Sequence, residues 1–209
     1  YLMKEYKLPI GCDVPETIIL ADGDFPSHPL ALEWLRQCPY VVCCDGAANT
    51  YIRSGRMPEA IVGDGDSLLP DIKERYASLI HSEAEQETND LSKAFRFCLS
   101  QERKRITIMG ATGKREDHTI GNVSLLADYM EQAEVSMMTD YGIFVPIRED
   151  SMFESYIGQQ ISVFNMNSTA LSAEGLAYPL SVFTNWWQGT LNEALAKHFI
   201  IRTEGKVLV

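Results

Sequence analysis

The 209-residue sequence lacks the features that mark several large protein classes. No apolar run approaches 18 residues, and the first residues do not follow a signal-peptide pattern, so neither a membrane-spanning helix nor export is expected. The five cysteines form no Cys-x-x-Cys pair, and Cys43 and Cys44 are adjacent in an apolar run, which is typical of reduced, buried thiols. These absences predict a soluble, cytoplasmic protein with no membrane partner.

Positive charge is also scarce. Lys and Arg number 18 against 29 Asp and Glu, which gives a formal net charge of -11. Such a field opposes binding to nucleic acids and to anionic membranes. A phosphorylated ligand would therefore need a local metal ion or a cationic side chain.

Four common site motifs are missing from the sequence. It contains neither the Gly-x-x-x-x-Gly-Lys-Ser/Thr loop of P-loop enzymes nor the Gly-x-Gly-x-x-Gly of standard NAD sites. Zinc-ligand spacing and the Gly-x-Ser-x-Gly elbow are absent too. Any nucleotide chemistry must therefore come from a different arrangement.

Up to about residue 140, short apolar runs alternate with helix-like segments. The runs are apolar throughout, which predicts strands buried on both faces of a parallel sheet, and the alternation predicts an α/β fold with helices on both faces. The expected strands are Thr17–Ala21, Tyr40–Cys44, Ala60–Val62, Leu79–His81, Ile106–Met109 and Val135–Thr139. The expected helices are Pro29–Gln37, Ala47–Ser54, Asp71–Tyr76, Asp90–Ser100 and Asp117–Met130, with Thr88 or Asn89 capping the fourth.

After Asp140 the helical periodicity largely disappears, which predicts a small antiparallel β unit. The expected strands are Gly142–Ile147, Met152–Tyr156, Gln160–Asn165, Leu176–Phe183, His198–Arg202 and Lys206–Val209, the last two joined as a hairpin at Thr203-Glu204-Gly205. Asn192–Lys197 is compatible with a short helix.

The third strand ends in Gly63-Asp64-Gly65-Asp66-Ser67. In extended backbone, Asp64 and Asp66 point to the same side, with α carbons about 6.5–7 Å apart. Two such carboxylates repel each other unless a cation lies between them, and hard oxygen ligands suit Mg²⁺. The alternative is an ordinary polar turn after a strand.

Other strands end in similar residues. The first strand leads into Ala21-Asp22-Gly23-Asp24, the second into Asp45-Gly46-Ala47-Ala48-Asn49, and a later one into Gly110-Ala111-Thr112-Gly113-Lys114-Arg115. Ligands of open α/β sheets lie beyond the carboxyl ends of the strands, and glycine-rich loops offer free backbone amides to phosphate. The four ends together predict a phosphate or nucleotide site.

Two helix starts add polar side chains. Asp90 completes a carboxylate cluster with Asp64 and Asp66, or only compensates the dipole of its helix. Arg115 suits phosphate binding, and it shares a face with His118 and Asn122 if the helix begins early. His118 is expected to support by hydrogen bonding rather than to act as a base, and Gly121 to allow a close backbone approach.

In this order, the motifs resemble those of the thiamine pyrophosphokinase family. The resemblance rests on Asp45-Gly46-Ala47-Ala48-Asn49, Gly63-Asp64-Gly65-Asp66-Ser67, Thr88-Asn89-Asp90, Gly110-Ala111-Thr112-Gly113-x-Arg115-x-Asp117-His118, Gly175-Leu176-x-Tyr178-Pro179-Leu180 and Gly189-Thr190-Leu191-Asn192-Glu193. It implies an N-terminal Rossmann-like α/β catalytic domain (1–142) and a C-terminal antiparallel β-sandwich domain for thiamine binding and dimerisation (143–209). It also implies a homodimer with active sites between subunits.

The resemblance implies Mg²⁺-dependent transfer of a pyrophosphoryl group from ATP to the hydroxyl of thiamine, which yields AMP and thiamine diphosphate. The implied metal ligands are Asp64, Asp66 and Asp90, which are also the implied catalytic residues together with Arg115. The implied nucleotide and thiamine contacts are Asp22, Gly23, Asp45, Gly46, Thr112, Arg115, Asp117, His118, Gln86 and Asn192. Trp186 and Trp187 are further candidates for a cation–π contact with thiamine, or else belong to a core or an interface.

The sequence departs from the family pattern at two places. Glu87-Thr88-Asn89-Asp90 stands where the family usually shows Asp-x-Thr-Asp, and Thr190-Leu191-Asn192-Glu193 where it shows Thr-Ser-Asn-Glu. Both concern the thiamine contacts more than the phosphate chemistry. Two rival functions are a Mg²⁺-dependent phosphotransferase for another small alcohol and a non-catalytic thiamine- or nucleotide-binding module.

Overall fold

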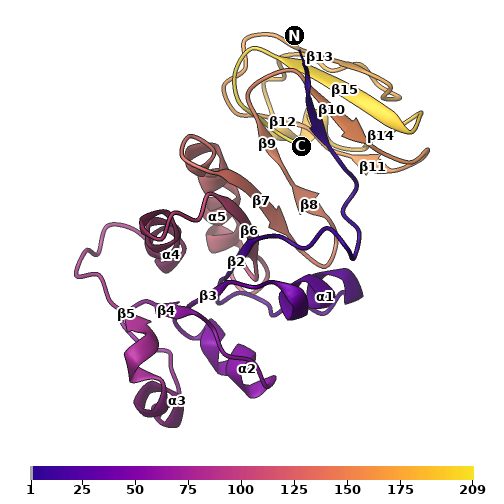
Figure 1. Cartoon of the computed structure of the whole chain (residues 1–209). Coiled ribbons are helices and arrows are strands. Elements are labelled where there is room, and N and C mark those ends of the chain that lie inside the picture. Colours follow the sequence, from indigo (N-terminus) through magenta and orange to yellow (C-terminus); the bar gives the residue numbers. More distant parts are fainter. Residues whose placement is uncertain (1) are drawn as a thin grey trace. The chain divides into compact units, whose positions relative to one another are not determined.

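The computed structural model describes residues 2–209 and divides the chain into two compact units (Figure 1). The larger unit is Gly11–Ile143, and the smaller unit joins the residues up to Ile10 with Phe144–Val209. The first residues thus belong to the C-terminal unit rather than to the expected N-terminal domain, because β1 (Lys4–Tyr6) pairs in parallel with β10 (Ser151–Glu154). No helix within residues 2–209 has the length and apolar character needed to cross a membrane.

The larger unit is built on a seven-stranded sheet in the order β5-β4-β3-β2-β6-β7-β8. The strands are β2 (Thr17–Leu20), β3 (Val41–Cys44), β4 (Ala60–Val62), β5 (Ile80–His81), β6 (Arg105–Met109), β7 (Glu134–Met138) and β8 (Ile143–Phe144). The pairs from β5 to β7 are parallel, as the continuous apolar runs predict. The carboxyl ends of these strands consequently meet at one edge.

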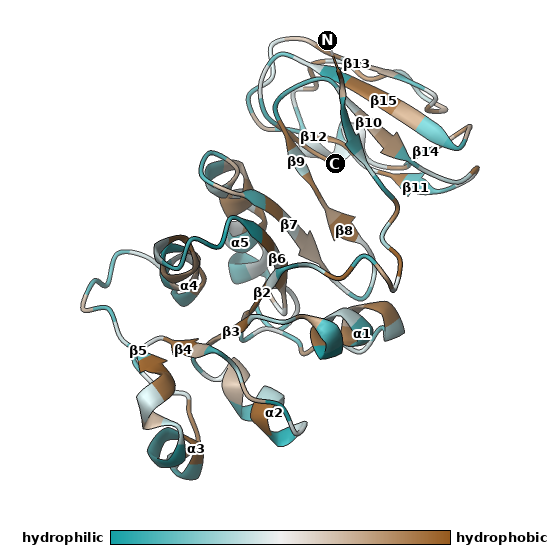
Figure 2. Ribbon diagram, in the orientation of Figure 1, coloured by the Kyte–Doolittle hydropathy of each residue, from teal (hydrophilic) through white to brown (hydrophobic). Residues whose placement is uncertain are grey.

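Helices cover both faces of this sheet. They are α1 (Pro29–Gln37), α2 (Ala47–Arg53), α3 (Pro70–Arg75), α4 (Asp90–Ser100) and α5 (Glu116–Tyr129), with a short 3-10 helix η1 (Ala77–Leu79). Ile18 and Leu20 of β2 pack with side chains of α1, α2 and α3, whereas α4 contacts β2, β3 and β4, and α5 contacts β7. Figure 2 shows mixed brown and teal along the helices, which bury one side and expose the other. The mixed α/β fold expected from the sequence is confirmed.

The start of α4 follows the sequence prediction closely. The side chain of Asn89 accepts a hydrogen bond from the Ser92 N–H at 3.0 Å, so Asn89 is the cap. Thr88 instead donates its hydroxyl and its backbone N–H to Glu85. Asp90 is therefore the first residue of the helix.

The smaller unit contains short, mainly antiparallel sheets around one core. Their orders are β1-β10-β15-β13, β12-β16-β9 and β11-β14. The remaining elements are β9 (Pro146–Ile147), β11 (Gln160–Ile161), β12 (Phe164–Asn165), β13 (Leu171–Glu174), η2 (Trp186–Gly189), β14 (Asn192–Glu193), β15 (His198–Thr203) and β16 (Val207–Leu208). Phe153, Ile161 and Val207, one from each sheet, pack in the same core cluster.

Three predictions for this unit were wrong. β15 and β16 do not form a hairpin, because β15 lies between β10 and β13 while β16 lies between β12 and β9. Residues 176–183 form no regular strand, since Pro179 lacks the N–H that a ladder needs, and only Leu176 makes a bridge, to Ala194. The segment from Asn192 begins as strand β14 rather than as a helix.

Candidate active site

The Gly- and Asp-rich strand ends of the larger unit lie at one edge of its sheet. β4, β3, β2 and β6 are consecutive neighbours and run parallel, so the residues that follow them emerge on the same side. Asp22 follows β2, Asp45 follows β3, Asp64 follows β4, and Thr112 follows β6. This is the edge at which ligands bind in open parallel sheets.

Asp45 directly follows β3 and is buried, with a left-handed backbone (φ 37°). Its Oδ2 accepts a hydrogen bond from the Ser67 N–H at 3.2 Å, while Oδ1 has no hydrogen-bond partner within residues 2–209. Burial raises the pKa of Asp45, and repulsion from Asp64 and Asp90 adds to that rise. A buried carboxylate oxygen without a hydrogen-bond partner is available to coordinate a cation.

Gly63 brings two of these carboxylates together. Its φ is 143°, and a Cβ there would lie 2.9 Å from Asp45 Cβ and 3.4 Å from Asp90 Oδ2. Glycine adopts this φ readily and has no Cβ that would collide with Asp45. The glycine therefore allows the loop carrying Asp64 to pass between the end of β3 and the start of α4.

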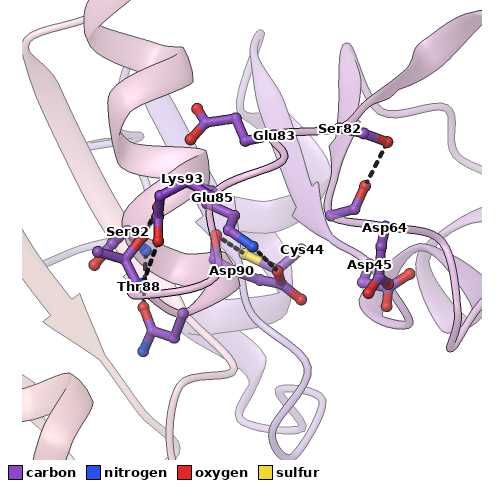
Figure 3. A network of polar contacts seen from close by, with 12 residues as sticks. Cys44, Asp45, Asp64, Ser82, Glu83, Glu85, Thr88, Asp90, Ser92 and Lys93 are labelled. Atoms are coloured by element: carbon purple, nitrogen blue, oxygen red, sulfur yellow. Dashed lines mark hydrogen bonds and ion pairs between the residues drawn. The ribbon is translucent and has the colours of Figure 1, made fainter.

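Asp90 lies at the first turn of α4, and Figure 3 shows it together with Asp45 and Asp64. Burial raises its pKa, repulsion from Asp64 and Asp22 acts in the same direction, and the Lys93 ammonium, 3.8 Å away, opposes them. The Cys44 thiol donates to the Asp90 carbonyl oxygen at 3.7 Å. Four acidic side chains from four segments thus interact electrostatically at this edge.

The donor chemistry of this cluster fits Mg²⁺. Carboxylate oxygens are hard ligands, and a bound cation would relieve the mutual repulsion of Asp45, Asp64 and Asp90 and engage the unpartnered Asp45 oxygen. Within residues 2–209, no group of three or more His, Cys, Asp or Glu side chains is close enough to hold a metal ion. Asp66 lies beside Asp64, whose Oδ1 accepts the Asp66 N–H at 3.0 Å. The triad Asp64, Asp66 and Asp90 stays a prediction.

A cavity of about 200 Å³ opens at the ends of β2 and β6. Its lining consists of Ala21, Asp22, Gly23, Asp24, Phe25, Ala47, Thr50 and Lys114. Gly23 donates to the Gly110 carbonyl at 2.6 Å, and a Cβ on Gly23 would lie 2.4 Å from the Gly110 and Thr112 oxygens. Glycine is thus required at this position for the two loops to pack, and a nucleotide contact of Gly23 stays a prediction.

Lys114 is a site residue that sequence reasoning missed. Its Nζ donates to the Asp22 carbonyl oxygen at 3.0 Å and lies 3.7 Å from Asp22 Oδ1. Burial raises the pKa of Asp22, and the Lys114 ammonium opposes part of that rise. The signal in the sequence was a lysine after Gly113 in a chain poor in cations. Its φ of 43° places it in a turn conformation that few side chains adopt.

Arg115 lies outside α5 rather than on it. It is the residue before the helix, with extended backbone (φ -115°, ψ 126°), so it does not share a helical face with His118 and Asn122. Its guanidinium pairs with Asp117 at 2.6 Å and 3.1 Å, which lowers the pKa of Asp117, and Asp117 Oδ1 also accepts the His118 N–H. Gly121 was expected at a close approach, but a Cβ there meets nothing within 4 Å.

The predicted thiamine contacts differ in their surroundings. Gln86 is exposed in the loop before α4. Asn192 is buried, and its side-chain amide donates to the Tyr178 carbonyl and accepts the Tyr178 N–H, at 2.9 and 3.0 Å. Trp186 and Trp187 are exposed on η2, where Trp186 also makes a T-shaped contact with Phe164, with ring centroids 6.1 Å apart.

Family models match most of the chain. The model described as "Thiamin pyrophosphokinase, catalytic domain" matches residues 31–138, and "Thiamin pyrophosphokinase, substrate-binding domain" matches residues 142–209. The chain belongs to the thiamin pyrophosphokinase family. The catalytic-domain match includes Asp45, Asp64 and Asp90 but begins after Asp22 and Gly23.

Relatives within the thiamin pyrophosphokinase family match part of the chain. Thiamine pyrophosphokinase 1 of Oryza sativa subsp. japonica is 30% identical over 129 residues, covering 50% of this chain and 49% of the relative. Thiamine pyrophosphokinase of Bacillus subtilis (strain 168) is 34% identical over 86 residues, covering 39% of this chain and 40% of the relative. The chain therefore spans about half the length, or less, of these relatives.

Solved thiamin pyrophosphokinase structures share the fold over nearly the whole chain. The yeast protein aligns with a TM-score of 0.79 at 16% identity, covering 100% of this chain and 90% of that one. The Candida albicans protein aligns with a TM-score of 0.78 at 18% identity, covering 99% and 91%. At these identities the likeness shows the fold.

Proposed function

We propose that the protein is a Mg²⁺-dependent thiamine diphosphokinase that transfers a pyrophosphoryl group from ATP to thiamine. The observation that carries the proposal is the electrostatic interaction of Asp22, Asp45, Asp64 and Asp90 at the carboxyl edge of the sheet, where Asp22 also lines a cavity. In an acidic chain such a cluster suits a metal-bound triphosphate, and the family supplies the acceptor, thiamine.

The proposed metal ligands are Asp64, Asp66 and Asp90, with Asp45 supporting them from the neighbouring strand end. Bound Mg²⁺ supplies charge neutralisation on the triphosphate, which favours the developing charge of a phosphoryl transfer. Asp45, fixed by the Ser67 N–H, keeps its free oxygen at the site.

The proposed nucleotide contacts are the residues around the cavity. Asp22 and Gly23 line it, and Gly46 and Thr112 lie next to these two residues. Lys114 provides a cation in the lining, and Arg115 follows it in the same loop. Both cations are paired with acids, so we expect phosphate oxygens to replace a carboxylate when ATP binds. Asp117 and His118 then keep the loop and the start of α5 in place.

In the proposed reaction the thiamine hydroxyl oxygen forms a bond to the β-phosphorus, and the bond from that phosphorus to the oxygen bridging to the α-phosphorus breaks. AMP leaves with that oxygen, and the hydroxyl proton passes to Asp90 or to another carboxylate of the cluster. The chain's contribution is mainly positioning of the two reactants.

We propose that the smaller unit, with the β-sandwich arrangement of the family, supplies thiamine contacts. Asn192 would act by holding the backbone of Tyr178, because both ends of its side-chain amide are already bonded there. The exposed rings of Trp186 and Trp187 suit a cationic aromatic ligand.

Asp64→Asn tests the proposal. We expect a rate loss on the order of 10²–10⁴, because the variant removes one charge from the proposed metal site. The measurement is mass detection of AMP and thiamine diphosphate made from ATP, Mg²⁺ and thiamine. The matched control is Asp128→Asn, the same change on the exposed far half of α5.

The outcomes separate the rival functions. AMP release at the wild-type rate in Asp64→Asn would refute the metal assignment. A wild type that makes AMP only with another small alcohol would be a different phosphotransferase, and one that binds ATP or thiamine without turnover would be a binding module.

We also propose a homodimer in the cytoplasm, as the family resemblance implies. A chain of 23.5 kDa should then elute and scatter light as a particle of twice that mass. A monomer at micromolar concentration with full activity would overturn this.

A further inference from the structure

Asn122 links two segments that belong to different strand ends. Its side chain is half-buried on α5, and its Nδ2 donates to the Ala111 carbonyl oxygen at 2.9 Å, in the loop after β6. Its Oδ1 accepts from Asn89 Nδ2 at 3.0 Å, and Asn89 in turn caps α4 by accepting the Ser92 N–H. The relay therefore runs from the loop after β6, through two side-chain amides, to the start of α4.

The two ends of the relay determine the orientation of both amides. The Ala111 carbonyl can only accept, so the Asn122 NH₂ must face it and its oxygen must face Asn89. The Ser92 N–H can only donate, so the oxygen of Asn89 must face Ser92 and its NH₂ must face Asn122. Each position needs a donor and an acceptor on two separate atoms. Aspartate and alanine lack the donor, and threonine carries both functions on a single oxygen, which does not replace the separate O and NH₂ of an amide.

The relay joins the two halves of the candidate site. The Ala111 loop includes Gly110 and Thr112, whose carbonyls accept the N–H groups of Gly23 and Asp24 at the cavity. Asn89 immediately precedes Asp90 of the carboxylate cluster. The position of Asp90 is therefore tied to the position of the cavity loop.

Holding α4 to α5 does not require this relay. Phe95 of α4 and Tyr129 of α5 stack at 4.0 Å, and the Ser92 hydroxyl and the Tyr129 hydroxyl lie 2.6 Å apart in the buried interface. The aromatic contact and the buried hydrogen bond hold the helices together. Asn89 is exposed, so its bond to Asn122 adds little stability and mainly sets where the helix starts lie.

We propose that Asn122 and Asn89 are positioning residues that couple the cavity loop to Asp90. This inference rests on the proposed function and adds a mechanism for matching nucleotide binding to the carboxylate cluster. Breaking the relay leaves the fold and both halves of the site in place but loosens the placement of one against the other. Loss of such placement reduces turnover more than substrate affinity.

Asn89→Thr is the selective variant. Threonine still caps α4 but has no NH₂ for Asn122. We expect kcat to fall about 10-fold with KM for thiamine changed less than about 3-fold, because a misplaced reacting group mainly costs turnover. Asn122→Ala should cost at least as much, and the double variant no more than Asn122→Ala alone, because both changes break the same relay.

Tyr129→Phe is the matched control. It removes the hydroxyl that contacts the Ser92 side chain but leaves the three hydrogen bonds of the relay, including that of the Ser92 N–H, in place, so it should lower the thermal midpoint and leave kcat unchanged. Losses in Asn89→Thr and Asn122→Ala that multiply in the double variant, or an unchanged kcat in Asn89→Thr, would overturn the inference.

Hydrogen exchange separates this inference from the proposed function. Adding ATP with Mg²⁺ to the wild type should slow exchange at residues 110–115 and also at residues 90–93. In Asn89→Thr, the slowing of exchange at residues 110–115 should persist, and the slowing at residues 90–93 should weaken. Coupled protection in a wild type that makes no AMP would refute the proposed function alone, whereas undiminished coupling in Asn89→Thr would refute the relay.

Discussion

At the scale of single residues, the candidate site depends on which polar atoms are already bonded. Asp45 keeps one oxygen without a partner within residues 2–209, whereas Asn192 has both ends of its amide bonded to Tyr178. The family resemblance implied a ligand contact for both. The contacts show that Asp45 has an oxygen available to a ligand, whereas Asn192 holds the backbone of Tyr178.

Asp140 shows the same principle at the end of β7. Its carboxylate accepts the backbone N–H groups of Ser27 and His28 at 2.9 and 2.8 Å and the Ser27 hydroxyl at 2.7 Å. These bonds lower its pKa, led by the bond from the His28 N–H. The carboxylate thereby holds the segment that leads from the cavity residues to α1.

We expect Asp140→Asn to destabilise the larger unit by about 1 kcal/mol at neutral pH, a modest value because the hydrogen bonds of Asp140 are partly exposed to solvent. The folded-state pKa of Asp140 is below its unfolded value, so its extra stability is present above about pH 4 and is lost as the pH falls through the folded-state pKa. Urea unfolding at pH 7 and pH 3 measures the difference, with exposed Asp13→Asn as control. A wild-type advantage that grows on acidification would contradict the assignment.

At the scale of elements, helix starts decide the site more than helix interiors do. α4 begins at Asp90 because Asn89 caps it, and α5 begins only at Glu116, which leaves Arg115 in the loop to pair with Asp117. Periodicity located both helices and placed Arg115 before the second, and the structure excludes the earlier helix start that would have put it on a face with His118 and Asn122. The backbone of the glycine-rich turn before it determines that boundary.

Gly121 and Gly110 give opposite predictions for the same substitution. Gly121→Ala should stabilise the protein by about 1 kcal/mol, since it lies inside α5 with nothing within 4 Å of the added Cβ. Gly110→Ala should destabilise it, because φ is 68° and the Cβ would lie 2.5 Å from the Ala21 carbonyl. Thermal melting measures both, and a destabilising Gly121→Ala would mean that the helix surface is in contact with something.

At the scale of the whole molecule, the two ends of the chain build one unit. β1 adds to β10, and Tyr6, Phe153 and Phe199 stack across three neighbouring strands with ring centroids 4.8 and 5.0 Å apart. A segment at the start of the sequence thus completes the core of the C-terminal unit.

Tyr6→Ala should destabilise this unit by about 2 kcal/mol, because it removes one outer ring of the stack. Near-ultraviolet circular dichroism during urea unfolding reports the loss of the aromatic packing. Leu2→Ala, at a fully exposed position before β1, is the control and should leave the transition unchanged. Equal effects of the two substitutions would show that β1 does not contribute through its aromatic ring.

The sequence by itself determined the α/β alternation, the strand ends that carry the acids and the family, because these depend on local periodicity and on motifs contiguous in the chain. The tertiary structure decided what depends on distant partners. Only pairing between remote strands shows that β1 joins β10 and that β15 and β16 separate, and only the packed loops show that Lys114 lies at the cavity and that Asn122 connects Ala111 to Asn89. Such contacts arise from the packing of segments far apart in the chain, and no local pattern encodes them.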